Sequence, residues 1–187
     1  MNESLLPARY AKALYKFALE KGIEGNIYTA MRNIANVMES HEGNDFRNAI
    51  ANPFVKNVDK RKLIIAAADI QANESETLSA FNDFLSLLFN NNRIDELKGI
   101  VYAYDKIFRT EKNISRVHVE WASEPSQQSE ERLKKMVADK LNGGTMEYSS
   151  SVNPLLIGGF KIAIDNELLD ASVENELRLL RQQILSK

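Results

Sequence analysis

The hydrophobic positions in the first 110 residues recur at the three- and four-residue spacing of amphipathic α-helices. Glycine, asparagine and proline residues divide this region into six short segments. The sixth segment has the clearest pattern, because its apolar residues all fall on one helical face. These residues are Ile94, Leu97, Val101, Tyr104 and Phe108. The pattern therefore predicts a compact bundle of six helices.

Particular residue types indicate where these helices begin and end. Gly22 and Gly25 are expected to end the first helix, because glycine favours helix termini. For the same reason, Gly43 and Asn44 are expected to end the second helix. Asp59 is expected to cap the fourth helix, since its carboxylate can accept hydrogen bonds from the free N–H groups of a first turn.

Beyond residue 110 the period of the pattern changes to two, which is typical of a half-buried β-strand. Val117, Val119 and Trp121 alternate there with polar residues. The other elements expected are a helix capped by Ser126, a strand over residues 146–152, a hairpin over residues 160–170 and a final helix over residues 172–185. The sequence thus predicts a mainly α fold: an N-terminal six-helix bundle over residues 1–110, then a small α+β domain over residues 111–187.

The first and fifth helices carry more apolar surface than one face of a bundle helix requires. At 100° per residue, their apolar side chains cover arcs of roughly 240° and roughly 200°, respectively. Two explanations remain open. Both helices could be central in the bundle and buried on several sides, or their surplus apolar surface could form a groove for an amphipathic helix of another protein.

The composition argues against most catalytic chemistry. The 187 residues include no cysteine and two histidines, which excludes a disulfide scaffold, a cysteine-ligated zinc site, a thiol nucleophile and a multi-histidine metal site. His41 falls at a helix end and His118 on the polar face of a strand, where structural or solvated roles are expected. The glycine pairs lack the flanking residues of a phosphate-binding loop. We therefore expect a protein that is not an enzyme and binds no cofactor.

Charge and hydropathy bear on nucleic-acid and membrane binding. The 24 Lys and Arg residues against 26 Asp and Glu residues give no basic excess. The densest basic run is Lys60-Arg61-Lys62, which allows a hypothesis of RNA binding, although such a run more often forms a solvated helix face. The longest strongly apolar stretch, residues 63–68, is far shorter than the roughly 20 residues of a membrane span. No signal peptide pattern is found, so any membrane association is expected through partners.

A series of motifs along nearly the whole chain resembles one protein family. The motifs are residues 7–14, Asn52-Pro53 with residues 60–65, residues 84–88 running into Asn92-Arg93, residues 153–160 and residues 169–173. In this order and spacing they resemble the ATP synthase delta subunit family, which includes the mitochondrial oligomycin-sensitivity-conferring protein. The chain departs from the family at Ala171, where glycine is common, and at Glu174, where a basic residue is common. Ala171 implies a turn that needs no positive φ or that has a slightly different shape.

The resemblance implies a non-catalytic peripheral-stalk (stator) subunit of F-type ATP synthase. In this family the helical bundle holds the N-terminal helix of an alpha subunit between its helices 1 and 5, and the C-terminal domain contacts the C-terminal region of the b subunit. Such a subunit clamps the catalytic head to the stalk and resists rotor torque during proton-driven ATP synthesis. The implied location is the cytoplasmic face of the bacterial inner membrane, reached only through the complex.

The resemblance also implies which residues contact each partner. For the alpha subunit they are Tyr10, Ala13, Leu14 and Phe17 of the first helix and Phe81, Leu85 and Leu88 of the fifth. For the b subunit they are Gly158, Gly159, Phe160, Asp170 and Ser172. No nucleic-acid partner is implied. The alternative hypothesis is a stand-alone helical adaptor that binds an amphipathic peptide in the groove between the first and fifth helices.

Overall fold

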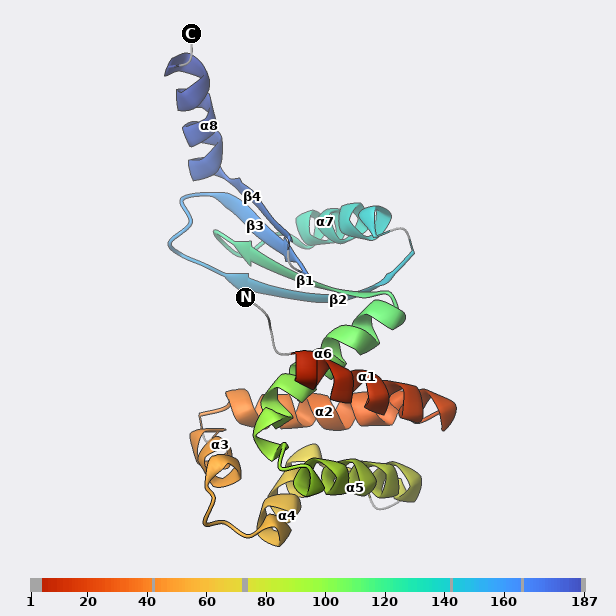
Figure 1. Ribbon diagram of the computed structural model, residues 1–187. Helices are drawn as coiled ribbons and strands as arrows, with labels where there is room; N and C mark the ends of the chain where they lie inside the picture. The colour runs from red at the N-terminus through yellow and green to blue at the C-terminus, as the bar shows by residue number, and fades with distance from the viewer. Residues whose placement is uncertain (1–4, 42, 72–73, 142, 166, 186–187) are drawn as a thin grey trace. The chain divides into compact units, whose positions relative to one another are not determined.

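The computed structural model describes residues 5–41, 43–71, 74–141, 143–165 and 167–185 (Figure 1). The chain divides into two compact units, Met1–Phe108 and Arg109–Lys187. Each unit contains buried apolar residues of its own. The first unit is helical and the second combines a sheet with two helices, which confirms the predicted fold class.

The first unit is built from six α-helices in the part of the chain that is described. They are α1 (Leu5–Glu20), α2 (Glu24–Glu39), α3 (Gly43–Ala51), α4 (Asn57–Ala68), α5 (Ser75–Asn90) and α6 (Leu97–Glu111), with a 3₁₀ turn, η1 (Ile94–Glu96), before α6. The last residues of α6 belong to the second unit. All five residues of the seam predicted for the sixth helix are buried, which confirms that pattern.

The expected helix ends are correct at some glycines and wrong at others. Gly22 follows α1 with a φ of 68°, as a glycine that ends a helix often does. Gly25 instead lies inside α2, because Glu24 already begins that helix. Asp59 lies in the first turn of α4, and the N-cap position is Lys56, whose side chain makes no capping hydrogen bond. The predicted cap at Asp59 is therefore wrong.

Gly43 begins α3 rather than ending α2, so this prediction is also wrong. A Cβ atom at Gly43 would lie 2.5 Å from the carbonyl oxygen of Val37 and would overlap that of Met38. Glycine is needed here because α3 starts in close contact with the last turn of α2. This reason is tertiary packing, which the local sequence pattern does not reveal.

Helices α2, α5 and α6 contribute many of the core residues of the first unit, and α1 and α4 add others. Fully buried side chains include Ile27 and Met31 of α2, Phe81 of α5 and Tyr104 of α6. The Tyr104 hydroxyl donates a hydrogen bond to the backbone carbonyl of Glu24 at 3.2 Å. Burial of this hydroxyl raises the pKa of Tyr104 above its ordinary value, since the charged form would lose its hydration.

The second unit is a four-stranded sheet with two helices (Figure 1). Its elements are β1 (Ile114–Trp121), α7 (Gln127–Lys140), β2 (Thr145–Val152), β3 (Gly159–Ile164), β4 (Glu167–Ser172) and α8 (Val173–Leu185). The strand order is β2-β1-β3-β4, with β1 and β2 parallel and the other pairs antiparallel. The predicted cap is confirmed, because the Ser126 side chain accepts a hydrogen bond from the Ser129 N–H at 3.2 Å.

The two faces of this sheet differ in character. On one face Val117, Val119 and Trp121 form a core with Leu133 and Val137 of α7. The alternate residues of β1 lie on the other face, so the predicted period of two is confirmed. Because α7 connects the parallel strands β1 and β2, it covers one face of the sheet. Among the described helices of the whole chain, none is long and apolar enough to cross a membrane.

Candidate docking surfaces

The three residues predicted on the fifth helix lie in the core of the bundle. Phe81, Leu85 and Leu88 are each 0% exposed. Helix α5 packs against α2 and η1, and on another side Arg61 of α4 donates a hydrogen bond to the Ser86 hydroxyl at 3.0 Å. Most of the wide apolar arc of α5 is therefore buried on several sides, while Leu87 is 47% exposed. Phe81, Leu85 and Leu88 support the helix and do not form an accessible surface.

Helix α1 has one buried side and one exposed side. Leu14, one of its four predicted residues, is buried at 3% exposure and belongs to the core. Ala13 and Phe17 are exposed and Tyr10 is half-buried, and Leu6, also half-buried, continues the same line. The spacing of 4, 3 and 4 residues places these four on one helical face. We call Leu6, Tyr10, Ala13 and Phe17 the α1 ridge.

The far end of the α1 ridge lies beside the first turn of α5. The Lys21 ammonium is 3.5 Å from the Glu76 carboxylate of α5, and 5.4 Å from the centre of the Phe17 ring. Ser79 and Asp83 are exposed positions on α5. The contact between Lys21 and Glu76 thus links the end of α1 to the first turn of α5, whereas the three apolar residues predicted on α5 are buried.

The basic run in α4 does not form a cationic surface. Lys60 is 5% exposed, and the Arg61 guanidinium donates hydrogen bonds to the Ser86 hydroxyl and the Asn82 carbonyl. Of the three residues, Lys62 alone is exposed. Binding of a nucleic-acid backbone requires several accessible cations along a line, so the geometry gives no support to the RNA hypothesis.

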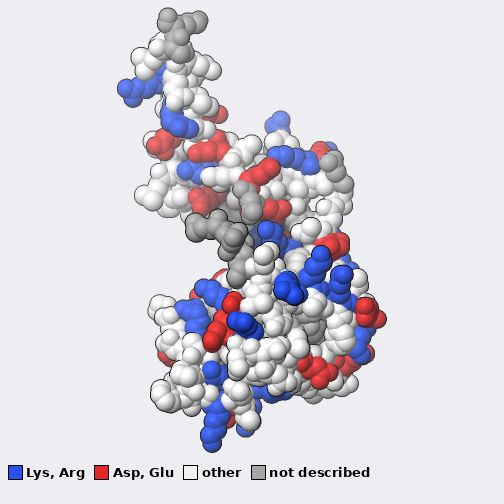
Figure 2. All heavy atoms as spheres, in the orientation of Figure 1, with Lys and Arg blue, Asp and Glu red and all other residues white. Residues whose placement is uncertain are grey.

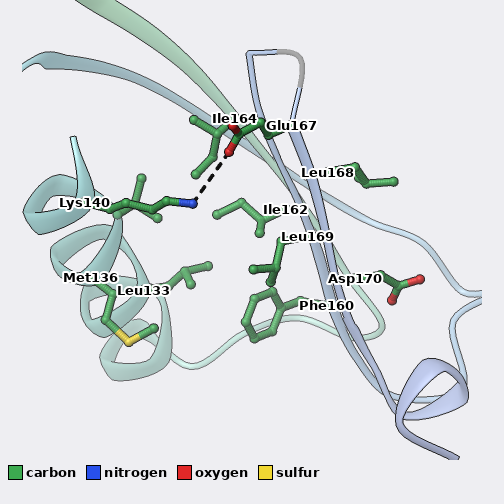
Figure 3. Close-up of a pocket in the computed structure, with 11 residues that line it drawn as sticks. Leu133, Met136, Lys140, Phe160, Ile162, Ile164, Glu167, Leu168, Leu169 and Asp170 are labelled. Atoms are coloured by element: carbon green, nitrogen blue, oxygen red, sulfur yellow. Dashed lines mark ion pairs between the residues drawn. The ribbon is translucent and has the colours of Figure 1, made fainter. Parts of the chain in front are cut away.

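In the second unit an apolar groove of about 460 Å³ lies between α7 and the β3–β4 hairpin (Figure 3). Leu133 and Met136 of α7 form one wall, and Phe160, Ile162 and Leu169 point toward them from the hairpin. An ion pair of 3.7 Å between Lys140 and Glu167 crosses one end. The groove has the apolar lining of a ligand or peptide site, and it includes Phe160 and Asp170 from the predicted b-subunit residues.

Two of the other predicted residues, Gly158 and Gly159, have a structural role. Gly159 has a φ of 80°, and a Cβ atom there would overlap the carbonyl oxygen of Ala171. A Cβ atom on Gly158 would lie 2.9 Å from the Val173 side chain, at the start of α8. Both glycines therefore allow β3 to approach the β4–α8 junction. Ala171 has no positive φ, in agreement with one of the two expectations for it, but it lies in strand β4 and not in a turn.

Asp170 and Ser172 hold this junction together by hydrogen bonds. The Asp170 carboxylate accepts a hydrogen bond from the Ser172 N–H at 3.0 Å, and the Ser172 hydroxyl accepts one from the Asn175 N–H at 3.3 Å. The hydrogen bonds from Ser172, together with Lys161 at 3.6 Å, lower the pKa of Asp170 below its ordinary value. Ser172 is buried at 1% exposure. These two residues position α8, and neither presents a large surface to a partner.

Helix α8 is the feature that the site prediction missed. None of its residues is buried. Its apolar face consists of Val173, Leu177, Leu180 and Ile184, with exposures of 38%, 58%, 54% and 75%. We call these four residues the α8 seam. Their spacing of 4, 3 and 4 residues is visible in the sequence and indicates one apolar helical face. The buried seam of α6 has the same kind of spacing, so the sequence alone does not show that the face of α8 is exposed.

His118 joins two strands on the open face of the sheet. Its Nδ1 atom lies 2.9 Å from the Ser149 hydroxyl, and its Nε2 atom lies 3.2 Å from the Ser151 hydroxyl. These contacts cross from β1 to β2, so they stabilise the strand pairing. Within the residues described, no group of three or more His, Cys, Asp or Glu residues is arranged to hold a metal ion.

Known proteins with similar sequences cover the whole chain. ATP synthase subunit delta of Parabacteroides distasonis is 34% identical over 99% of this chain and 98% of that protein. The delta subunit of Bacteroides thetaiotaomicron is 30% identical over 100% of this chain and 97% of that protein. The ATP synthase subunit delta of Ilyobacter tartaricus, described as sodium ion specific, is 31% identical over 95% of this chain and 97% of that protein.

The fold is also found in a solved structure. A chain in the cryo-EM structure of the Toxoplasma gondii mitochondrial ATP synthase hexamer superimposes with a TM-score of 0.69, covering 96% of this chain and 97% of that one, at 19% identity. The family model described as "ATP synthase delta (OSCP) subunit" matches residues 6–184. The match spans both units, the α1 ridge and the α8 seam. The chain therefore belongs to the ATP synthase delta (OSCP) subunit family.

Proposed function

We propose that this chain is a non-catalytic peripheral-stalk subunit that links the catalytic head of an F-type ATP synthase to its b-subunit stalk. One observation carries the proposal: each of the two units presents an uncovered apolar helical face, the α1 ridge in the first and the α8 seam in the second. A chain with two separate docking surfaces can connect two partners. In this role it resists rotor torque, so that rotation drives nucleotide chemistry in the head.

The α1 ridge is proposed to receive the N-terminal helix of an alpha subunit. Its 4-3-4 spacing presents a row of side chains along one helical face, as packing against another helix requires. Ala13, near the middle of the ridge, allows close approach of a partner backbone, while Tyr10 and Phe17 offer aromatic contacts on either side. The buried residues Leu14, Phe81, Leu85 and Leu88 hold the two helices in place.

The second unit is proposed to receive the C-terminal region of the b subunit. The α8 seam offers four apolar side chains, and two very exposed residues extend this surface: Leu155 at 89% and Ile157 at 78%. Both lie in the loop that contacts the start of α8, where the Val173 N–H donates a hydrogen bond to the Gly158 carbonyl at 3.0 Å. The groove beside Phe160 provides a further apolar contact.

The proposed location is the cytoplasmic face of the bacterial inner membrane, where the chain is held through its partners. Two observations support this location. The matching relatives include delta subunits from several bacteria. The apolar surfaces found on the chain have helical spacing and side-chain sizes suited to protein partners, and the described helices include no membrane span.

Binding of a synthetic alpha-subunit N-terminal peptide from the same organism, measured by titration calorimetry, tests the head contact. We expect micromolar or tighter binding to the native chain and at least about tenfold weaker binding to Ala13→Arg, since the arginine places charge on an apolar contact. Ala8→Arg is the matched control, because Ala8 is an exposed alanine on another side of α1. Equal losses in both variants, or no binding by the native chain, would contradict the proposal.

The linking role is tested with the assembled parts. Purified catalytic heads should sediment with the b-subunit stalk only when this chain is added. Leu180→Arg in the α8 seam should abolish this co-sedimentation while leaving peptide binding at the α1 ridge intact. A stand-alone adaptor would instead bind the peptide and fail to join head and stalk, so this measurement separates the two hypotheses.

A further inference from the structure

We infer that Glu174 and Glu176 make the α8 seam selective for a partner helix whose apolar stripe is flanked by lysine or arginine. The inference rests on the proposed stalk contact and adds the charge chemistry of the segment that is bound there. The two glutamates flank the first half of the seam, one on each side, and both are exposed.

The spacing of the α8 seam specifies a helix as its partner. Val173, Leu177, Leu180 and Ile184 occupy the d, a, d and a positions of a heptad pattern. A repeat averaging 3.5 residues keeps two α-helices in contact along their length as they coil around each other. A flat surface or an extended peptide does not require this repeat. The side chains are uncovered along the whole helix, since α8 has no buried residue.

Charges flank this seam asymmetrically along the helix. Glu174 follows Val173 at an e position and Glu176 precedes Leu177 at a g position, whereas Arg181 occupies the next e position. Figure 2 shows acidic side chains at the base of α8, next to the sheet, and basic side chains farther along the helix. Residues at e and g positions of paired helices meet the flanks of the partner, so they select its charge.

The carboxylates of the two glutamates are not paired with a cation in the described part of their unit. Neither side chain forms a hydrogen bond or an ion pair with any residue that the structure describes. Between them, Asn175 is fully engaged, since its side-chain amide donates to the Asp170 carbonyl at 2.8 Å. A partner with Lys or Arg beside its apolar stripe would supply the missing positive charge.

Acidic residues at these two positions also have an effect that does not involve a partner. Negative charge in a first turn stabilises a helix through the macrodipole, with or without a partner. That effect predicts a loss of α8 helicity when the charges are reversed. It predicts no dependence on the charge of a bound peptide. The test therefore measures binding preference and not stability.

The test uses two synthetic helical peptides with the same leucine heptad stripe, one flanked by lysines and one by glutamates. Fluorescence anisotropy of the labelled peptides measures their binding to the full chain at low salt. We expect about tenfold tighter binding of the lysine-flanked peptide, a preference that weakens at high salt. The double variant Glu174→Lys/Glu176→Lys should reverse the preference. The control Glu124→Lys/Asp139→Lys, which makes the same change in net charge at exposed positions away from α8, should retain it.

The possible outcomes distinguish this inference from the proposed function. If both peptides bind equally, or if the double variant keeps the native preference, the charge selectivity is refuted while docking at the seam stands. If neither peptide binds, docking at the α8 seam itself is refuted. Circular dichroism of each variant shows whether its helical content is retained. Tight binding of the glutamate-flanked peptide by the double variant would itself show that the α8 seam of that variant is intact.

Discussion

Helices α5 and α8 both carry an apolar stripe in the sequence, yet their surroundings in the structure are opposite. In α5 the buried residues include Phe81, Phe84, Leu85 and Leu88, whereas in α8 none is buried. Helix α5 is enclosed by α2, η1 and the Arg61 side chain of α4. Helical periodicity therefore indicates that a face will be covered, and only the fold tells whether the cover comes from the same chain.

The two helices also differ in how they are attached. Side-chain packing on several sides fixes α5, while α8 is held at its first turn by the hydrogen bonds of Asp170, Ser172 and Asn175. Truncating a packed side chain lowers stability because it leaves a cavity. The stability of a junction held by a titratable carboxylate instead depends on pH. The following predictions test this difference, beginning with the largest effect.

Leu85→Ala should lower the free energy of unfolding of the first unit by about 2–5 kcal/mol, because it leaves a cavity at a fully buried position. Urea denaturation followed by circular dichroism measures this loss. The only tryptophan of the chain, Trp121, lies in the core of the second unit, so its fluorescence reports on that unit separately. A shift of the Trp121 transition as large as the circular dichroism shift would contradict independent cores.

Leu180→Ala should leave stability within about 0.5 kcal/mol of the native value, since the side chain is 54% exposed. Its binding to the b-subunit segment should weaken by about 2 kcal/mol, roughly 30-fold. Calorimetry measures the binding and denaturation the stability. Gln182→Ala, on the opposite side of α8, serves as the control and should change neither. Loss of stability without loss of binding would show that the α8 seam belongs to the core.

Tyr104→Phe should destabilise the bundle by about 1 kcal/mol, because the Glu24 carbonyl loses its hydrogen bond. Since burial raises the pKa of Tyr104, the folded state favours its neutral form. This contribution is complete below the ordinary value of 10.0 and is lost as the pH rises above it. Thermal melts from pH 8 to pH 11 should show a steeper loss in the native protein than in Tyr104→Phe. Identical slopes would contradict the assignment.

The smallest effect should come from acidification of the α8 junction. The hydrogen bonds from Ser172 lower the pKa of Asp170, so the charged carboxylate stabilises the folded junction above the ordinary value of 3.8. This stabilisation is lost as the pH falls through the lowered pKa. NMR titration of the Asp170 carboxyl carbon and of α8 amide signals measures both events. In Asp170→Asn the pH-dependent change of the α8 amide signals should disappear. If those signals still change in the variant, protonation of Asp170 is not the cause.

The sequence alone predicts most of the fold because its periodicities are clear. The seam of α6 and the alternation of Val117, Val119 and Trp121 depend on positions close in the chain, and the structure confirms both. The wrong predictions of helix ends occur where contacts with residues distant in the sequence determine the structure. Gly43 is needed because α3 starts against the last turn of α2, and no local pattern contains that contact.

The docking surfaces were less predictable for a related reason. Apolar side chains on α1 and α5 can be assigned to helical faces, but which face is buried depends on neighbours such as Arg61. Leu14 and Leu85 therefore belong to the core, while Ala13 and Phe17 remain accessible. On α8 the heptad spacing was present in the sequence, but the buried seam of α6 has the same kind of spacing, so the spacing alone does not tell which of the two helices is exposed.

The short connection between α6 and β1 has a mechanical consequence. Helix α6 ends at Glu111 and β1 begins at Ile114, so Lys112 and Asn113 alone lie between them. Three fully stretched backbone steps span about 10 Å, and this is all the slack that the connection can contribute under load. If α6 and β1 are pulled apart, tension reaches the hydrogen-bonded ladder of β1 at one end and the packed side of α6 at the other with little elastic delay.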